Sequence, residues 1–315
     1  MEEFHKSVLL KESIHYLKIQ KGEKYIDATI GGGGHTEAIL KKEGKVLGID
    51  CDPEAIKAAR RHLSQACPVP HRDGAGPDAF WRHAQGNFAH LKEIAQKEGF
   101  SQVAGVLFDL GVSTHQLETP QRGFSFSLKG PLDMRMDPSL SVTAADLING
   151  LSKGELNELF SKLGQEKYSR RLAAAIVSAR RVRLIETCEE LTRIIIEARP
   201  KRARGEKISR RAGPRRWRRH PATRVFLALR IAVNDELNNL KKALPQAIEI
   251  LKPKGRLVVI SFHSGEDRIV KQFLRRERGK KLKILTEKPV RPTPEERKQN
   301  PRSRSAKLRA AEKVR

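Results

Sequence analysis

Short apolar runs and amphipathic segments alternate along the first third of the chain. Apolar runs rich in β-branched residues predict buried strands at 25–30, 46–49 and 103–109. Hydrophobic residues at helical spacing predict helices at 35–40, 53–63 and 90–97. A third strand is expected to end near Gly86, and the Pro-, Gly- and His-rich segment 64–84 predicts a surface loop. Strands that alternate with helices are typical of an α/β fold with a parallel sheet.

The alternation stops near residue 119. From 119 to 219 the pattern shows helical stripes and no strand, and two of the stripes begin at capping boxes that start with Ser152 and Thr187. Apolar side chains on one face of such helices are most simply the core of a helical bundle. The sequence therefore predicts a helical insertion in the sheet.

Strand-forming sequence returns towards the C-terminus. The segment 224–251 predicts a long helix, kinked or broken at Pro245, and 251–261 predicts a turn and a buried strand. The last strands are expected at 281–285 and 307–314. These patterns predict two domains. The α/β domain consists of residues 1–118 and 220–315, and the helical insertion between them consists of residues 119–219.

The first strand runs into four consecutive glycines, 31–34, which predict a tight turn at a ligand. Glycine allows the backbone to approach a ligand closely and to take positive φ. The second strand ends at Asp50, the place where an acid binds the ribose hydroxyls of an adenine nucleoside. A dinucleotide fingerprint requires a third glycine, but Thr36 or Glu37 occupies its position, which disfavours a dehydrogenase. The alternative is a glycine turn without a ligand.

Positive charge is concentrated in two stretches. The chain of 315 residues has 63 Lys and Arg against 37 Asp and Glu, a net charge of +26. The segment 199–219 has a net charge of +10 and 271–315 a net charge of +12. Such clustering points to a polyanionic partner, most often nucleic acid, although a solvated basic face is the simpler alternative.

Cysteine and hydropathy patterns indicate a reducing compartment and no membrane segment. The three cysteines, Cys51, Cys67 and Cys188, are odd in number and far apart, so no disulfide framework is expected. The ten histidines show no ligand spacing, so no metal is expected. The N-terminus has no apolar signal region and no apolar run is long enough to span a bilayer, so we expect a cytoplasmic protein.

Longer blocks in the middle and C-terminal parts are more specific than the glycine turn. They are Asp109-Leu-Gly-Val-Ser113, Arg122-Gly-Phe-Ser-Phe126, Gly130-Pro-Leu-Asp-Met-Arg-Met-Asp137, His220-Pro-Ala-Thr-Arg224, Ile260-Ser-Phe-His-Ser264 and Asn300-Pro-Arg-Ser-Arg304. Together they resemble the ribosomal RNA small-subunit methyltransferase H family, from His5 to Lys313. The chain departs from the family at Ser7, where proline is frequent, at Gly265, where leucine is usual, and in a longer 67–84 loop.

The resemblance implies a Rossmann-like class I S-adenosylmethionine-dependent methyltransferase fold with a helical insertion. The implied reaction methylates N4 of a cytosine in the decoding region of bacterial 16S ribosomal RNA, within the small ribosomal subunit. The implied cofactor contacts are Gly33, Gly34, His35, Asp50, Phe88, Asp109 and Gln116.

Three residues are candidates for positioning the cytosine amino group: Asp109, Ser113 and His263. This nitrogen is a weak nucleophile because its lone pair is delocalised into the ring, so an acceptor that holds one N–H favours attack. The sequence does not rank the three, and Asp109 could serve the cofactor alone or cap a helix. Carbon-5 methylation requires a cysteine near the end of the fourth or fifth strand, and none lies there.

RNA contacts are expected from aromatic and arginine side chains. Phe124 and Phe126 could stack on a flipped base or simply pack the insertion. The expected phosphate contacts are Arg210, Arg211, Arg215, Arg216, Arg218 and Arg219. A non-catalytic RNA-binding assembly factor on the same fold is the alternative function. The sequence leaves open the oligomeric state, a homodimer included, and whether free RNA or an assembled subunit is the substrate.

Overall fold

The computed structural model describes residues 7–66, 80–200 and 220–314 of the chain. It divides into two compact units, Met1–Ser113 with Leu237–Arg315, and Thr114–Glu236. The sequence placed these boundaries at 118/119 and 219/220. Each unit is described by itself below.

The first unit contains a seven-stranded sheet in the order β3-β2-β1-β4-β5-β7-β6. The strands are β1 (Lys24–Asp27), β2 (Lys45–Asp50), β3 (Trp81–Gln85), β4 (Val103–Asp109), β5 (Leu251–Ser261), β6 (Leu282–Ile284) and β7 (Lys307–Lys313). The first five are parallel, whereas β7 is antiparallel to both of its neighbours, β5 and β6. The strands predicted at 25–30, 46–49, 103–109, 251–261, 281–285 and 307–314 are all present, with shifted ends in most cases.

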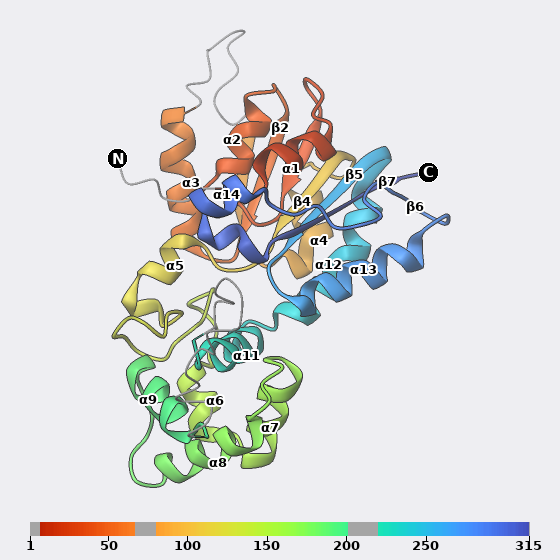
Figure 1. The fold of residues 1–315 in the computed structure, drawn as a ribbon. Coiled ribbons are helices and arrows are strands. Elements are labelled where there is room, and N and C mark those ends of the chain that lie inside the picture. Colours follow the sequence, from red (N-terminus) through yellow and green to blue (C-terminus); the bar gives the residue numbers. More distant parts are fainter. Residues whose placement is uncertain (1–6, 67–79, 201–219, 315) are drawn as a thin grey trace. The chain divides into compact units, whose positions relative to one another are not determined.

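Helices cover both faces of this sheet (Figure 1). On one face, α4 (Leu91–Lys97), α12 (Glu236–Ile250) and α13 (Ser264–Glu277) pack on β1, β2, β4 and β5 in the larger hydrophobic core. The other face buries α1 (Leu10–Leu17) and α2 (Gly34–Leu40), and α3 (Pro53–Ala66) packs beside Ile30. The short helices α14 (Pro294–Gln299) and η4 (Pro301–Ser305) precede β7. This is a Rossmann-like α/β arrangement, as predicted.

Two local predictions were wrong. Strand β3 ends at Gln85, as expected, but it begins at Trp81, inside the segment predicted as a loop. It forms the edge of the sheet beside β2, and its side chains are exposed or half-buried. The predicted long helix is two helices, α11 (Thr223–Val233) and α12, and Pro245 lies within α12. The break falls at Asn234 and Asp235, where Asp235 takes a left-handed φ of 47°.

The second unit is helical. It comprises α5 (Thr114–Glu118), η3 (Pro120–Arg122), α6 (Ala144–Gly150), α7 (Lys153–Lys162), α8 (Ser169–Arg180), α9 (Cys188–Ala198) and α11. The capping boxes predicted at Ser152 and Thr187 are both formed, and Thr143 makes a third at α6. These caps satisfy backbone N–H groups that the first helical turn leaves unpaired.

The block at 130–137 forms an ordered loop in this unit. Arg122 Nη2 donates hydrogen bonds to the carbonyl oxygens of Arg135 and Met136, at 3.1 and 2.9 Å. Asn234 Oδ1 accepts from the Met136 N–H at 2.7 Å. One conspicuous sequence block therefore has a structural function, because it fixes the chain that leads into α6.

Candidate active site

Three acidic residues end neighbouring parallel strands of the first unit. Asp27 ends β1, Asp50 ends β2 and Asp109 ends β4. The register pairs Asp27 with Gly48 of β2 and Leu107 of β4, so the three strand ends lie along one edge of the sheet. Ligands of open α/β sheets bind at this carboxyl edge.

The glycine turn follows β1 at the same edge. Gly33 precedes α2 with a left-handed φ of 84°, which strains any side-chain-bearing residue. A side chain at Gly34 would clash with the Ser7 hydroxyl. The backbone at Gly33 therefore requires glycine, whereas at Gly34 only the position of the Ser7 side chain opposes a substitution.

Asp50 is fixed against this turn by two backbone donors. Its Oδ2 accepts from the Gly31 N–H and its Oδ1 accepts from the Asp52 N–H, each at 3.0 Å. A carboxylate has about four acceptor sites, so acceptor capacity remains for a ligand. Burial raises the pKa of Asp50 to about 6 against the lowering effect of these hydrogen bonds. The half-buried carboxylate is preorganised as an acceptor.

The carboxyl group of Asp109 receives fewer hydrogen bonds than that of Asp50. Its side chain is 11% exposed, and its Oδ2 lies 3.6 Å from His35 Nδ1. Its Oδ1 is buried and has no hydrogen-bond partner within the described residues. Burial, followed by the charges of Asp27 and Glu266, raises the pKa of Asp109 well above its ordinary value. Thr29 Oγ1 accepts from the Asp109 N–H at 2.6 Å and so anchors the end of the strand.

Asp27 adds a second buried carboxyl group to this edge. It is 1% exposed, and its Oδ2 accepts from the Thr36 hydroxyl at 2.8 Å. Burial raises its pKa to about 6. Several carboxyl groups held in a low-dielectric edge favour a ligand that brings positive charge and hydrogen-bond donors. Asp27 opens the motif that contains the glycine turn, and Glu266 stands in the block that follows His263, but neither was among the predicted site residues.

Phe88 lies beyond the end of β3 in η2 (Phe88–His90). Its ring meets Phe108 edge to face, with centroids 5.7 Å apart and an angle of 89° between the planes. The last residue of β3, Gln85, pairs with Asp50 in the sheet. The half-buried Phe88 ring thus follows the strand end that neighbours Asp50, as a base-binding side chain requires.

His263 follows β5 and caps α13. Its Nδ1 accepts from the Gly265 N–H at 3.2 Å, and Glu266 Oε2 accepts from the His263 N–H at 3.1 Å in return. Since the ring already has a structural function, this contact gives no support for its selection as an acceptor for the substrate. Ser113 is the half-buried last residue of the first segment of this unit.

The remaining predicted residues belong to the helical unit or lie outside the described residues. Gln116 and Phe124 belong to the helical unit and are 4% and 6% exposed. Burial of Phe124 favours the packing alternative for this ring. Phe126 is half-buried in the same unit. Contacts of the helical unit with the cofactor or RNA stay predictions, and the arginines chosen for phosphate contacts, Arg210, Arg211, Arg215, Arg216, Arg218 and Arg219, lie outside the described residues.

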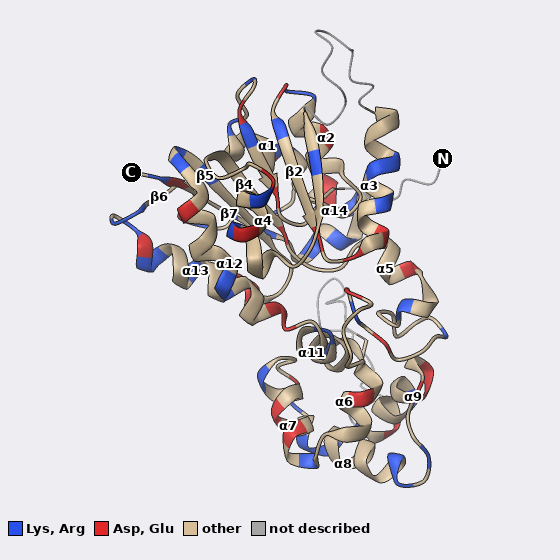
Figure 2. Cartoon of the chain, turned by 180° about the vertical axis from the view of Figure 1, so that it is seen from behind, with Lys and Arg blue, Asp and Glu red and all other residues tan. Residues whose placement is uncertain are grey.

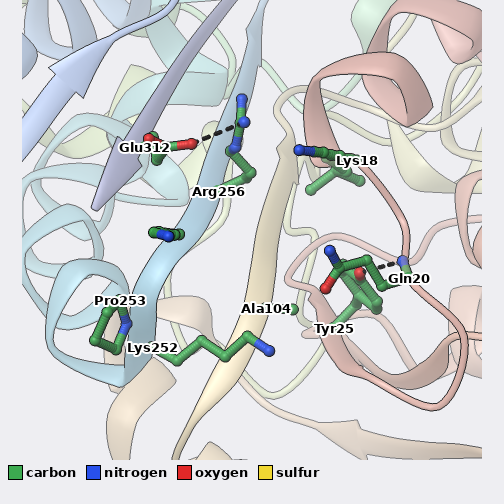
Figure 3. A pocket seen from close by; sticks show the side chains of 10 residues that line it. Lys18, Gln20, Tyr25, Ala104, Lys252, Pro253, Arg256 and Glu312 are labelled. Carbon is green, nitrogen blue, oxygen red and sulfur yellow. Dashed lines mark hydrogen bonds and ion pairs between the residues drawn. The ribbon is translucent and has the colours of Figure 1, made fainter. Parts of the chain in front are cut away.

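A cavity of about 210 Å³ lies at the opposite, amino end of β1, β4 and β5 (Figure 3). It is lined by Tyr25, Ala104 and Arg256 among others, and contains none of the predicted site residues. Arg256 pairs with Glu312 at 2.8 Å, and Lys252 with Glu23 at 2.5 Å. These ion pairs tie the sheet together away from the candidate site.

Comparison with known proteins assigns the family. Residues 2–314 match the sequence model of the MraW methylase family. The chain belongs to the MraW methylase family. A ribosomal RNA small subunit methyltransferase H from Thermomicrobium roseum is 46% identical over 333 residues, covering 98% of this chain and 94% of the relative. One from Carboxydothermus hydrogenoformans is 44% identical, covering 100% and 99%.

Solved structures show a more distant likeness to this member of the family. An rRNA methylase from Streptococcus thermophilus is 10% identical with a TM-score of 0.44, covering 98% of both chains. TrmN from Thermus thermophilus is 10% identical with a TM-score of 0.42, covering 97% of this chain and 48% of that one. In residues 7–66, 80–200 and 220–314, no helix combines the length and apolar character needed to cross a membrane.

Proposed function

We propose that this methylase transfers a methyl group from S-adenosylmethionine to N4 of a cytosine in the decoding region of small-subunit ribosomal RNA. The carboxyl edge formed by Asp50 and Asp109 carries the proposal, because a preorganised acceptor and an unsatisfied buried carboxyl oxygen lie there beside the glycine turn. Relatives that span the whole chain and are named ribosomal RNA small subunit methyltransferase H support RNA as the substrate.

The residues at this edge suit the proposed cofactor. Asp50 would hold the ribose hydroxyls, and Phe88 would lie against the adenine. Asp109 and Asp27 would favour the cationic end electrostatically, because burial destabilises their charged forms and a bound cation would offset that cost. When bound, the cofactor supplies an electrophilic methyl group on a sulfonium sulfur. The protein's part is mainly to bind, orient and exclude water.

Nitrogen is favoured over carbon as the methyl acceptor by the cysteines. Methylation at carbon 5 requires a thiolate nucleophile, but Cys188 Sγ donates to the Gly123 carbonyl at 3.2 Å in the helical unit. Burial raises the pKa of Cys188 to about 11, which opposes thiolate formation. Cys51 follows β2, and Cys67 lies outside the described residues. Asp109 and Ser113 are the preferred candidates for holding the amino group.

The helical segment between β4 and β5 is proposed to recognise the RNA. In sequence it connects Asp109 at the end of β4 to β5, and the +10 stretch at 199–219 lies near its end. Phe126 and the arginines of that stretch are the proposed RNA contacts. A target base within a duplex must leave the stack before it can react, and a separate recognition element can hold it out.

Incubation with radiolabelled cofactor and small subunits that lack the modification tests the function. The digest should yield labelled N4-methylcytidine, and Asp109→Asn should reduce the label strongly. Label in 5-methylcytidine or a methylated purine would overturn the assignment. Binding of RNA without any transfer would favour the assembly-factor alternative. Cofactor binding that survives in Asp109→Asn would place the carboxylate on the base.

A further inference from the structure

His220 begins the last described segment of the helical unit and is fixed by its own backbone. Its Nδ1 accepts from the Ala222 N–H at 3.2 Å, and its carbonyl oxygen accepts from the Thr223 N–H at 3.0 Å. These bonds orient the imidazole at the start of α11. With Nδ1 as the acceptor, the neutral ring carries its proton on Nε2.

The ring lies flat on Phe126. The two centroids are 4.4 Å apart and the planes differ by 4°. Phe126 in turn meets Phe226 edge to face, at 5.7 Å and 88°. Phe226 is 4% exposed, Phe126 is half-buried and His220 is exposed. The three rings thus lead from the core to the surface, and the imidazole of His220 is the exposed member of the stack.

Arg199 binds the backbone next to His220. Its Nη2 donates to the Pro221 carbonyl at 3.4 Å and to Glu166 Oε2 at 3.1 Å, and its guanidinium lies 5.5 Å from the centre of the Tyr168 ring. Burial and the charge of Arg199 lower the pKa of His220, so the ring is neutral near pH 7. A neutral, flat, rigidly backed ring with an N–H at its edge matches what a nucleobase requires of a stacking partner.

We propose that His220 is a stacking platform for an unpaired nucleobase of the RNA, with Phe126 as its support. This inference rests on RNA being the substrate. It moves base stacking from Phe126, where the sequence placed it, to the ring that covers Phe126. Stacking of a base on an aromatic side chain tolerates any base, so His220 would increase affinity more than sequence choice.

The simpler explanation is that His220 only starts α11, and two substitutions separate these functions. His220→Asn keeps an acceptor for the Ala222 N–H but removes the ring. His220→Phe keeps the ring but removes the acceptor. If stacking matters, Asn should weaken binding of a single-stranded RNA oligonucleotide and raise KM for the small subunit, each by roughly tenfold. Phe should stay close to wild type in both, with a lower melting temperature.

If His220 has only a structural function, the two variants should rank in the opposite order. Activity would then follow the melting temperature, and His220→Phe would be less active than His220→Asn. Either that order or unchanged RNA affinity in His220→Asn would overturn the inference. Cofactor affinity, measured by calorimetry, should stay constant in both variants. Wild-type protein that binds no RNA at all would instead refute the proposed function, so the two failures are distinguishable.

Discussion

Two aspartates at the same sheet edge, Asp50 and Asp109, differ in the hydrogen bonds that their carboxyl groups receive from the protein. Asp50 receives two backbone N–H donors, whereas Asp109 Oδ1 has none within the described residues. The first arrangement stabilises a carboxylate before any ligand arrives. The second leaves a buried polar atom unsatisfied, which costs free energy until a partner is bound. Asp50 therefore suits an anchoring contact, and Asp109 suits the contact that is completed only in the loaded enzyme.

Replacement of Asp50 by alanine should weaken S-adenosylmethionine binding by roughly 1–3 kcal/mol, because the ribose hydroxyls would lose their acceptor. Calorimetric titration measures this directly. Glu93→Ala is a suitable control, since that side chain is 84% exposed on α4. Equal affinities of the Asp50 variant and wild type would remove Asp50 from the cofactor site.

Cofactor affinity should also depend on pH. The pKa of Asp50 is raised to about 6 in the protein, so acidification through pH 6 protonates the anchoring carboxylate. Only the ionised form accepts fully from two hydroxyls, so affinity should be constant above pH 7 and fall below pH 6. The limiting decline is about tenfold per pH unit for one group. Titrations between pH 5 and 8 test this, and Asp50→Asn should reduce the decline to the part that Asp27, whose pKa is also raised to about 6, contributes.

At the scale of elements, α13 carries a test of His263. The ring accepts the Gly265 N–H as the N-cap of this helix. His263→Ala should lower stability by about 1 kcal/mol, whereas His263→Asn should retain most of it, because asparagine is a good N-cap residue. Chemical denaturation gives these values. If His263 is only a cap, the Asn variant should also methylate normally. A stable but inactive Asn variant would restore His263 as a substrate contact.

Periodicity predicted the elements that are buried, and it failed where burial is weak or where tertiary contacts decide. Strand β4 is buried along most of its length and its predicted bounds are those observed. Strand β3 lies at a sheet edge, so its side chains carry no apolar signal. The break before α12 is fixed by the left-handed Asp235 and by Asn234, which binds Met136 ninety-eight residues earlier in the chain. No local pattern contains such a contact.

The same distinction applies to the site. Asp50 and the glycines could be predicted because a single βαβ unit brings them together, and the Gly31 N–H does bind Asp50. The effect of Asp27 and Glu266 on the pKa of Asp109 could not be predicted. Asp27 ends β1, Asp109 ends β4 and Glu266 lies in α13, so only the complete fold brings them together. Electrostatic coupling across a sheet edge depends on register, which the sequence specifies only through the complete fold.

At the scale of the whole molecule, Lys and Arg are spread over both units (Figure 2). Several in the C-terminal segment have structural partners: Lys307 and Arg309 both bind Asp267, at 2.8 and 2.7 Å. Lys313 Nζ donates to the Leu251 carbonyl at 2.5 Å. The segment 271–315, expected to bind phosphates throughout, is thus partly committed to the sheet.

Neutralising the stretch at 210–219 should therefore weaken RNA binding selectively. Replacing its six arginines by glutamine should flatten the dependence of log affinity on log salt, by about 0.7 for each phosphate group of a single strand that the protein no longer neutralises. Cofactor affinity should hardly change. A matched variant with Lys280, Lys281, Lys283 and Lys288 neutralised tests the C-terminal segment separately. An unaltered salt slope in the first variant would make that stretch a solvated surface.

The strand order also determines when this protein can fold during its synthesis. Strand β4 pairs with β5, which begins at residue 251, and β5 pairs with β7, whose last residue is Lys313. Neither pair of strands can form before the later strand has been synthesised. The helical unit is one continuous stretch and needs no later residues, so a nascent chain can complete it first. The sheet keeps an unpaired edge at β5 until residues 307–313 have been synthesised. A chain that stops before Lys307 would therefore expose the edge of β5 and be prone to aggregate.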